Sequence, residues 1–138
     1  MNSKPPIIVT ATTQPFWDGV KRRELLLQYD ASHRRYQFFP RPISLYSNQP
    51  LEWRAAKGTG TLAAITNTYF AAPGFADKLP YLEGLITLDE GPRIFAPVIG
   101  AMLDELRPGR RMRIVWPEPD GTDAHPFQFE PIPDAHQA

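Results

Sequence analysis

Prolines occur along almost the whole chain, and they limit how long any helix or strand can be. The sequence has 16 prolines among 138 residues, where average usage would give about seven. Proline removes a backbone donor and interrupts both helices and central strands. Together with nine glycines, this pattern favours short strands and turns, and a length of one domain or one domain with a small appendage.

One helix is predicted near the start of the chain. Thr12 or Thr13 can cap it, and Pro15 fits in a first helical turn, where its missing N–H group removes no hydrogen bond. Phe16 and Val20 then fall on one face at a spacing of four, with Trp17 beside them. The spacing predicts a helix over 14–24.

The rest of the chain has mainly β character, with turn residues between apolar segments. We expect strands over 25–29, 36–39, 51–54, 59–69, 81–88, 93–99, 110–116 and 127–129, and a short helix over 101–106. The strands over 59–69, 81–88 and 93–99 come first, the short helix follows, and the last two strands come after it. Three strands, a helix and two strands is the element order of an OB-fold, a five-stranded barrel. A small β-sandwich or another small barrel fits the same count.

Composition excludes several classes of protein. There is no cysteine, so disulfides, thiolate catalysis and thiolate metal sites are excluded. The formal net charge is zero, which argues against a nucleic-acid-binding role. Residues 1–15 have no signal-peptide pattern, and no apolar run reaches the ~20 residues of a membrane-spanning helix. We therefore expect a cytoplasmic protein that does not bind membranes.

No catalytic motif is found, and we expect neither enzymatic activity nor a cofactor. None of His33, His125 and His136 lies beside a nucleophile motif, and the phosphate and dinucleotide loop patterns are missing. The segment 58–60, Gly-Thr-Gly, is interpreted as a strand kink or bulge at the barrel entry. The acidic pair at 89–90 precedes Gly-Pro and is interpreted as a hairpin turn.

Short motifs along the chain, none specific alone, together resemble one family. They are Pro15-Phe16-Trp17-Asp18-Gly19, Leu26-Leu27-Gln28, Gln37-Phe38-Phe39-Pro40-Arg41-Pro42, Leu51-Glu52-Trp53, Gly58-Thr59-Gly60-Thr61, Ala72-Pro73-Gly74-Phe75, Pro80-Tyr81, Leu88-Asp89-Glu90-Gly91-Pro92-Arg93 and Leu106-Arg107-Pro108-Gly109. In order and spacing, from about 14 to 130, the chain is similar to the acyl-CoA-associated OB-fold family, in which a rubredoxin-like zinc ribbon precedes the barrel.

The resemblance implies four zinc-ligand positions, and this chain has no cysteine at any of them. The positions are Asp30, His33, Ser44 and Ser47. A metal-free ribbon is the favoured interpretation; the alternative is a replacement site built on the first two residues. Since a structural zinc ion contributes to folding, packing or a partner subunit must replace it. The candidate packing residues are the aromatic side chains Tyr29, Tyr36, Phe38, Phe39 and Tyr46.

The expected domain organisation follows from the same resemblance. Residues 1–27 form an N-terminal arm and helix, 28–50 a degenerate, metal-free zinc-ribbon-like β insert, 51–131 the five-stranded OB-fold barrel and 132–138 a flexible tail. The fold class is mainly β.

The implied function is that of a non-catalytic accessory subunit in lipid or polyketide metabolism. Such proteins associate with thiolase-like, aldolase or hydratase enzymes acting on acyl-CoA, typically as hetero-oligomers of two plus two. The candidate interface residues are Phe16, Trp17, Phe38, Phe39, Arg41 and Tyr46. One alternative is direct acyl-CoA binding, with arginines on the phosphates and the loop 71–80 over the acyl chain. Another is binding of single-stranded nucleic acid on the barrel.

Overall fold

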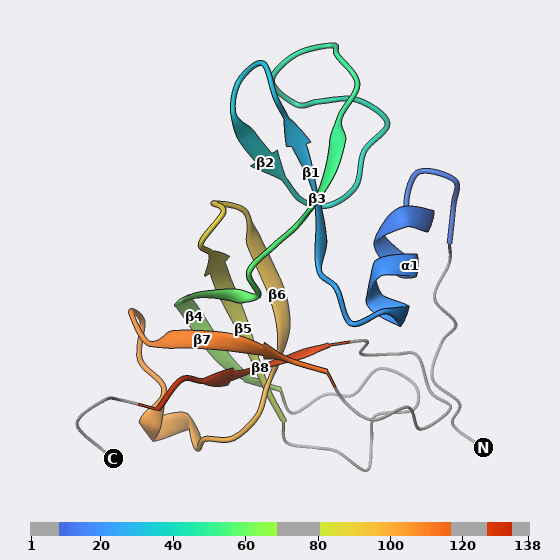
Figure 1. The fold of residues 1–138 in the computed structure, drawn as a ribbon. Coiled ribbons are helices and arrows are strands. Elements are labelled where there is room, and N and C mark those ends of the chain that lie inside the picture. The colour runs from blue at the N-terminus through green and yellow to red at the C-terminus, as the bar shows by residue number, and fades with distance from the viewer. Residues whose placement is uncertain (1–8, 69–80, 117–126, 134–138) are drawn as a thin grey trace.

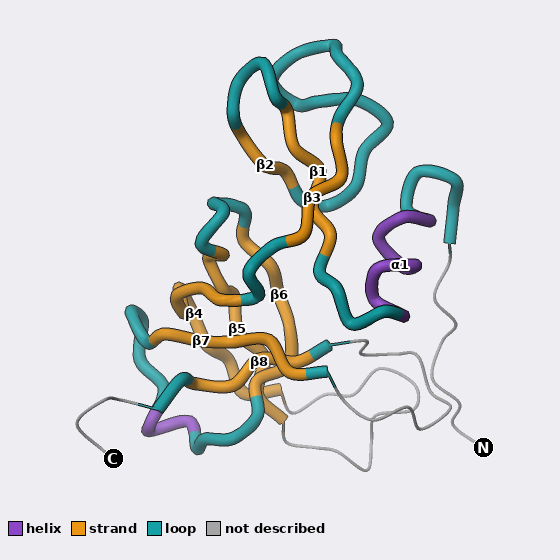
Figure 2. The backbone as a smooth tube through the Cα atoms, in the orientation of Figure 1, coloured by secondary structure: helices purple, strands orange, loops and turns teal. Residues whose placement is uncertain are grey.

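The computed structural model describes residues 9–68, 81–116 and 127–133, and the loop 71–80 and the tail from 134 onward lie outside this range. One helix and two β units follow each other along the chain (Figures 1 and 2). Within the described residues, no helix has the length and apolar character needed to cross a membrane.

Helix α1 spans Gln14–Lys21, with Pro15 in its first turn as predicted. It is three residues shorter than expected. The backbone N–H groups of Arg22 and Glu24 both bond to the carbonyl of Gly19, and Arg23 takes a left-handed φ of 61°. This arrangement satisfies the last helical carbonyl groups and turns the chain into the first strand.

The first β unit is a three-stranded antiparallel sheet, which we call the insert. Strand β1, Leu26–Asp30, lies between β2, Arg35–Gln37, and β3, Glu52–Ala55. Strand β3, which the expected boundary between 50 and 51 assigned to the barrel segment, pairs with β1 in the register Leu26 to Ala55. A strand's own pattern identifies it as a strand but does not identify its neighbour.

The second β unit is a closed five-stranded barrel, which confirms the predicted OB-fold. Its strands are β4 Thr59–Thr68, β5 Tyr81–Leu88, β6 Arg93–Val98, β7 Arg111–Val115 and β8 Gln128–Pro131. Their order is β4-β5-β6-β8-β7, and β7 pairs with β4 to close the barrel. The helix expected over 101–106 is a single 3-10 turn, η2, at Leu103–Glu105.

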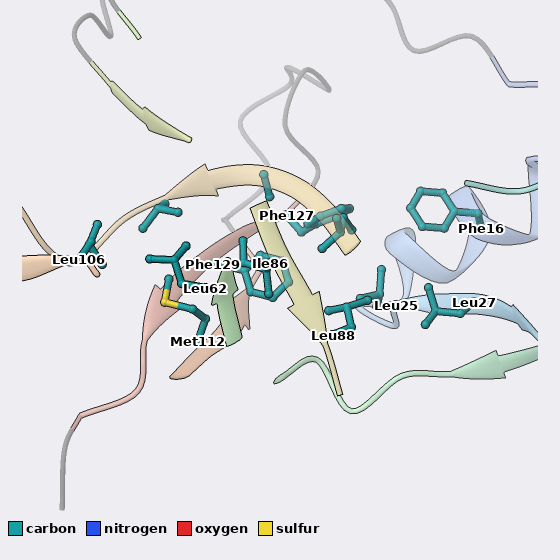
Figure 3. Close-up of a cluster of buried hydrophobic side chains, with 13 residues drawn as sticks. Phe16, Leu25, Leu27, Leu62, Ile86, Leu88, Leu106, Met112, Phe127 and Phe129 are labelled. Carbon is teal, nitrogen blue, oxygen red and sulfur yellow. The ribbon is translucent and has the colours of Figure 1, made fainter. Parts of the chain in front are cut away.

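One hydrophobic core connects the barrel with the helix and the start of the insert. Figure 3 shows its side chains extending from Leu106 and Met112 at one end of the barrel to Phe16 on α1 at the other. The rings of Phe16 and Phe127 are 6.4 Å apart and make an edge-to-face contact. Because α1 is held in this way, the base of the insert has a fixed position beside the barrel.

The Gly-Thr-Gly segment begins strand β4, where the backbone of the neighbouring strand β5 comes very close. Gly58 has a φ of +79°, and the register shift on this strand lies further on, between Leu62 and Ala64. A Cβ atom on Gly60 would lie 2.5 Å from the carbonyl oxygen of Thr87 on the neighbouring strand. Glycine is therefore required at position 60 by the close approach of two backbones.

We expect Gly60→Ala to lower the free energy of unfolding by about 2 kcal/mol, because the added methyl group must displace strand β5. Urea denaturation followed by tryptophan fluorescence measures this loss. The matched control is Ala64→Ser on the exposed side of the same strand, which should change stability by less than about 0.5 kcal/mol. Equal stability of the Gly60 variant and the wild type would contradict the close approach of the two strand backbones.

Candidate functional site

The carboxylate of Asp30 lies at the centre of a polar cluster in the insert. Asp30 is the last residue of β1 and is only 2% exposed. Its Oδ1 atom accepts hydrogen bonds from the backbone N–H of Ser32 at 2.9 Å and of His33 at 3.1 Å, and from the Ser32 hydroxyl at 2.7 Å. The turn between β1 and β2 is thus built around one carboxylate oxygen.

A second turn approaches the other carboxylate oxygen from the loop between β2 and β3. The hydroxyl groups of Ser44 and Ser47 donate to Asp30 Oδ2 at 2.5 and 2.8 Å. The Oγ atom of Ser44 in turn accepts the backbone N–H groups of Tyr46 and Ser47. Both turns therefore share one pattern, in which a side-chain oxygen accepts the N–H groups of the residues two and three positions ahead.

All four expected ligand positions are brought together by these contacts. The imidazole Nδ1 of His33 lies 3.4 Å from Asp30 Oδ2, with 49% of its side chain exposed. The sequence suggested packing or a partner subunit in place of a metal ion, and to these the structure adds five hydrogen bonds that converge on the Asp30 carboxylate. The sequence signal was present as three serines spaced around one aspartate, but only the fold shows that they meet.

The cluster keeps Asp30 ionised at neutral pH. The hydroxyl groups of Ser32, Ser44 and Ser47 and the backbone N–H of His33 hold the pKa of Asp30 well below its ordinary value, although burial acts in the opposite direction. A carboxylate that accepts several hydrogen bonds is stabilised in its charged form. Asp30 is therefore a permanent acceptor and not a proton donor near pH 7.

These residues do not fit the zinc ion that the family resemblance implies. A structural zinc site uses four thiolate or imidazole ligands, whereas the cluster offers one carboxylate, one imidazole and two hydroxyl groups that already act as donors. Across the described ranges, no three His, Cys, Asp or Glu residues lie close enough together to hold a metal ion. Asp30 Oδ2 instead occupies the middle of the cluster.

Aromatic packing adds to the hydrogen bonds, as the sequence suggested. Tyr29 and Tyr36 pair across the sheet with ring centroids 4.7 Å apart, and the guanidinium of Arg54 lies 3.8 Å above the Tyr29 ring. Arg35 stacks in the same way on Tyr46 at 4.1 Å. Such cation–π contacts contribute about 0.5–1 kcal/mol each at exposed positions. The rings thus flank the carboxylate cluster.

Two buried glutamines fix the long loop between β2 and β3. Gln28 bonds to both the N–H and the carbonyl group of Arg41, at 2.8 and 2.7 Å. Gln37 accepts the N–H of Leu45 at 2.8 Å and donates to the carbonyl of Ile43 and to Gln28. The side-chain amides of two residues in the sheet therefore fix the backbone of this loop.

The predicted interface residues occupy different environments. Phe16 is 1% exposed and belongs to the core, so its expected place on a docking surface is corrected. Trp17 and Phe38 are half-buried against the core, and Tyr46 is half-buried beneath Arg35. The exposed members of the predicted set are Arg41 and Phe39, and the Phe39 ring also packs against Phe16 with ring centroids 6.1 Å apart.

The acidic pair at 89–90 forms a turn, as predicted. Arg111 donates two hydrogen bonds to the Asp89 carboxylate, at 2.8 and 2.9 Å, and the Thr59 hydroxyl adds a third. Arg111 and Thr59 together hold the pKa of Asp89 well below its ordinary value. The group connects β4, β7 and the β5–β6 turn where the barrel closes.

Residues 53–117 match the family model of the ChsH2 C-terminal OB-fold domain. This segment, 65 of the 138 residues, is similar to that family's domain. The resemblance expected from the sequence is thereby confirmed for the ChsH2-type barrel. No protein among curated sequences matches the chain.

Solved structures share the whole fold, the insert included. One is described as an Ltp2-ChsH2(DUF35) aldolase, with a TM-score of 0.79 and 22% identity over 91% of this chain and 98% of that one. Another is a DUF35-family protein of unknown function from Sulfolobus solfataricus, with a TM-score of 0.62 and 12% identity over 90% and 87% of the two chains. The arrangement of helix, insert and ChsH2-type barrel is therefore a shared architecture.

Proposed function

We propose that this chain is a non-catalytic accessory subunit of a thiolase-like, aldolase or hydratase enzyme that acts on acyl-CoA substrates. The observation that carries the proposal is the likeness, over 91% of this chain, to a DUF35 protein whose structure is described as an Ltp2-ChsH2 aldolase. In that description a protein of this fold is named together with an aldolase. By analogy, the partner performs the chemistry and this chain supports it.

The polar groups of the described residues favour a supporting role. General acid–base catalysis works best with a group whose pKa lies near the working pH, yet Asp30 and Asp89 are both held ionised by their hydrogen bonds. His33 approaches the Ser32 hydroxyl at 3.1 Å and Asp30 at 3.4 Å through the same atom, Nδ1. A triad needs the two opposite nitrogens of the ring, so this set cannot relay a proton.

Co-expression with candidate thiolase-like, aldolase and hydratase enzymes from the same genome tests the proposal. We expect the two proteins to co-purify as a stable hetero-oligomer, and the enzyme to lose activity or solubility when expressed without the chain. Size-exclusion chromatography with light scattering gives the stoichiometry. An isolated chain that is a monodisperse monomer and binds none of these enzymes would contradict the proposal.

Direct binding of acyl-CoA is a second candidate, favoured by one feature of the barrel. Beside η2 lies a depression of about 650 Å³ whose lining includes Arg107 and Arg110. Arginine is suited to bidentate contacts with phosphate, and coenzyme A carries three phosphate groups. The lining also includes Asp104 and Glu105, which oppose an anionic ligand. Titration calorimetry with acyl-CoA thioesters of several lengths tests it, and an absence of both heat and thermal shift excludes it.

A further inference from the structure

The tip of the insert carries apolar side chains that the fold leaves uncovered. In the loop between β2 and β3, Ile43 is 48% and Leu45 55% exposed. Phe39, 46% exposed, does not belong to the tip, because its ring packs against Phe16 of α1 with ring centroids 6.1 Å apart. The backbone beside Ile43 and Leu45 is fixed by the amide groups of Gln28 and Gln37. Because the loop is already ordered, little backbone entropy is lost when a partner covers these side chains.

The exposed side chains of the same segment carry positive charge and no negative charge, since the Asp30 carboxylate is buried. Residues 31–50 contain three arginines and no aspartate or glutamate, in a chain whose formal net charge is zero. The three are Arg34, Arg35 and Arg41, all exposed. No described carboxylate lies within ion-pair distance of any of them, whereas four other arginines are paired with Glu24, Glu52, Asp89 and Glu130.

We propose that Ile43 and Leu45, with Arg34, Arg35 and Arg41, form a docking surface, the tip surface, for an apolar depression rimmed by carboxylates on the enzyme partner. The inference rests on the proposed function and adds where and by what chemistry the partner is recognised. Large apolar side chains and arginine are enriched in the cores of protein interfaces. The arginine charges also steer association with an acidic surface. Figure 1 shows the insert projecting from the barrel, so that its tip reaches a partner without obstruction from the described barrel strands.

An anionic membrane is the other surface that attracts apolar and basic groups. Polybasic membrane sites typically contain about four to eight Lys or Arg residues, more than the three arginines of this segment. Insertion into lipid would also have to accommodate the polar side chains of Asn48 and Gln49, which are exposed beside the tip. A protein partner accounts better for a fixed loop with few charges.

The test compares two double variants in the co-purified complex. Ile43→Asp/Leu45→Asp removes the apolar part, and Arg34→Glu/Arg41→Glu reverses the charge. We expect each to weaken the complex at least about tenfold by surface plasmon resonance. The affinity of the wild type should fall as salt increases, and the charge variant should lose this dependence. The matched control is Met102→Asp, an apolar barrel residue that is 69% exposed, with an expected change below about twofold.

The binding results decide between the two proposals once thermal unfolding has shown that the variants keep their fold. If the wild type binds the enzyme and both double variants bind equally well, the tip surface is overturned and the proposed function stands. If the wild type binds no enzyme, both proposals fail. If it sediments with phosphatidylserine vesicles and the apolar variant does not, the surface faces a membrane and the inference is overturned.

Discussion

Replacing Asp30 by alanine should unfold the insert while the barrel remains folded. The change leaves the hydroxyl groups of Ser44 and Ser47 and two backbone N–H groups without their shared acceptor. Buried donors without acceptors are strongly destabilising. Because the strands of the insert form a sheet of their own and none of them pairs with a described barrel strand, we expect a separate early transition, lower in Tm by about 10 °C or more. Calorimetry and limited trypsin cleavage at Arg34 and Arg35 detect it.

Two further variants identify the cause. Asp30→Asn keeps the size of the side chain but replaces one acceptor oxygen by a donor, so it should behave nearly as badly as alanine. Asp104→Asn removes an exposed carboxylate on η2 and should leave the Tm within about 2 °C. If Asp30→Ala melted in one transition at the wild-type temperature, the carboxylate cluster would have no structural importance.

Acidity should act on the wild-type insert in the same way. The pKa of Asp30 is depressed in the folded state by its hydroxyl and backbone donors, so its contribution to stability is complete above the unfolded value of about 3.9. That contribution is lost as the pH falls below this value towards the folded pKa. We expect the early transition to appear in the wild type only in acid. A Tm that is flat from pH 5 to pH 2 would contradict this.

A quadruple cysteine variant should convert the cluster into a zinc site. The replaced residues are Asp30, His33, Ser44 and Ser47. Since three of these side chains surround the Asp30 carboxylate within 3.4 Å, four thiolates placed there should complete a tetrahedron. Structural zinc contributes about 10 kcal/mol or more in isolated zinc-finger peptides. We therefore expect an insert that is unfolded without metal and folded with one zinc ion per chain.

Cobalt substitution provides the measurement, because tetrahedral thiolate coordination of Co²⁺ gives intense visible absorption. The matched control, Asp30→Cys/Ser44→Cys, has one thiolate on each turn and should bind the metal far more weakly. If the quadruple variant bound no metal, or only in a form without tetrahedral absorption, the two turns would not share one centre. The wild type should be unaffected by zinc or by EDTA.

The barrel was the part of the fold most accessible from the sequence. Turn residues separate its strands, and alternation along Arg111–Val115 places Met112 in the core, where it is fully buried. These are local signals, read within a few residues. The partner of β3 was not accessible, because Glu52–Ala55 pairs with a strand more than 20 residues earlier in the chain, and no local pattern encodes that choice.

The candidate site divides in the same way. The positions of Asp30 and Ser44 came from a resemblance, but their hydrogen bond joins residues 14 apart in the chain, which spacing alone cannot establish. Phe16 was a candidate both for the core and for the interface, and its contact with the distant barrel residue Phe127 belongs to the core in which it is buried. Conversely, the exposure of Ile43 and Leu45 depends on amide groups that hold the loop outward.

The oxygen atoms that close the insert have a consequence for the conditions under which the chain keeps its shape. Thiolates can be oxidised to disulfides or to sulfenic, sulfinic and sulfonic acids. A fold that depends on a bound metal ion unfolds when the metal is removed. A carboxylate surrounded by serine hydroxyl groups undergoes neither reaction. The insert should therefore keep its shape through oxidative stress and zinc starvation, conditions that would disable a thiolate-ligated ribbon.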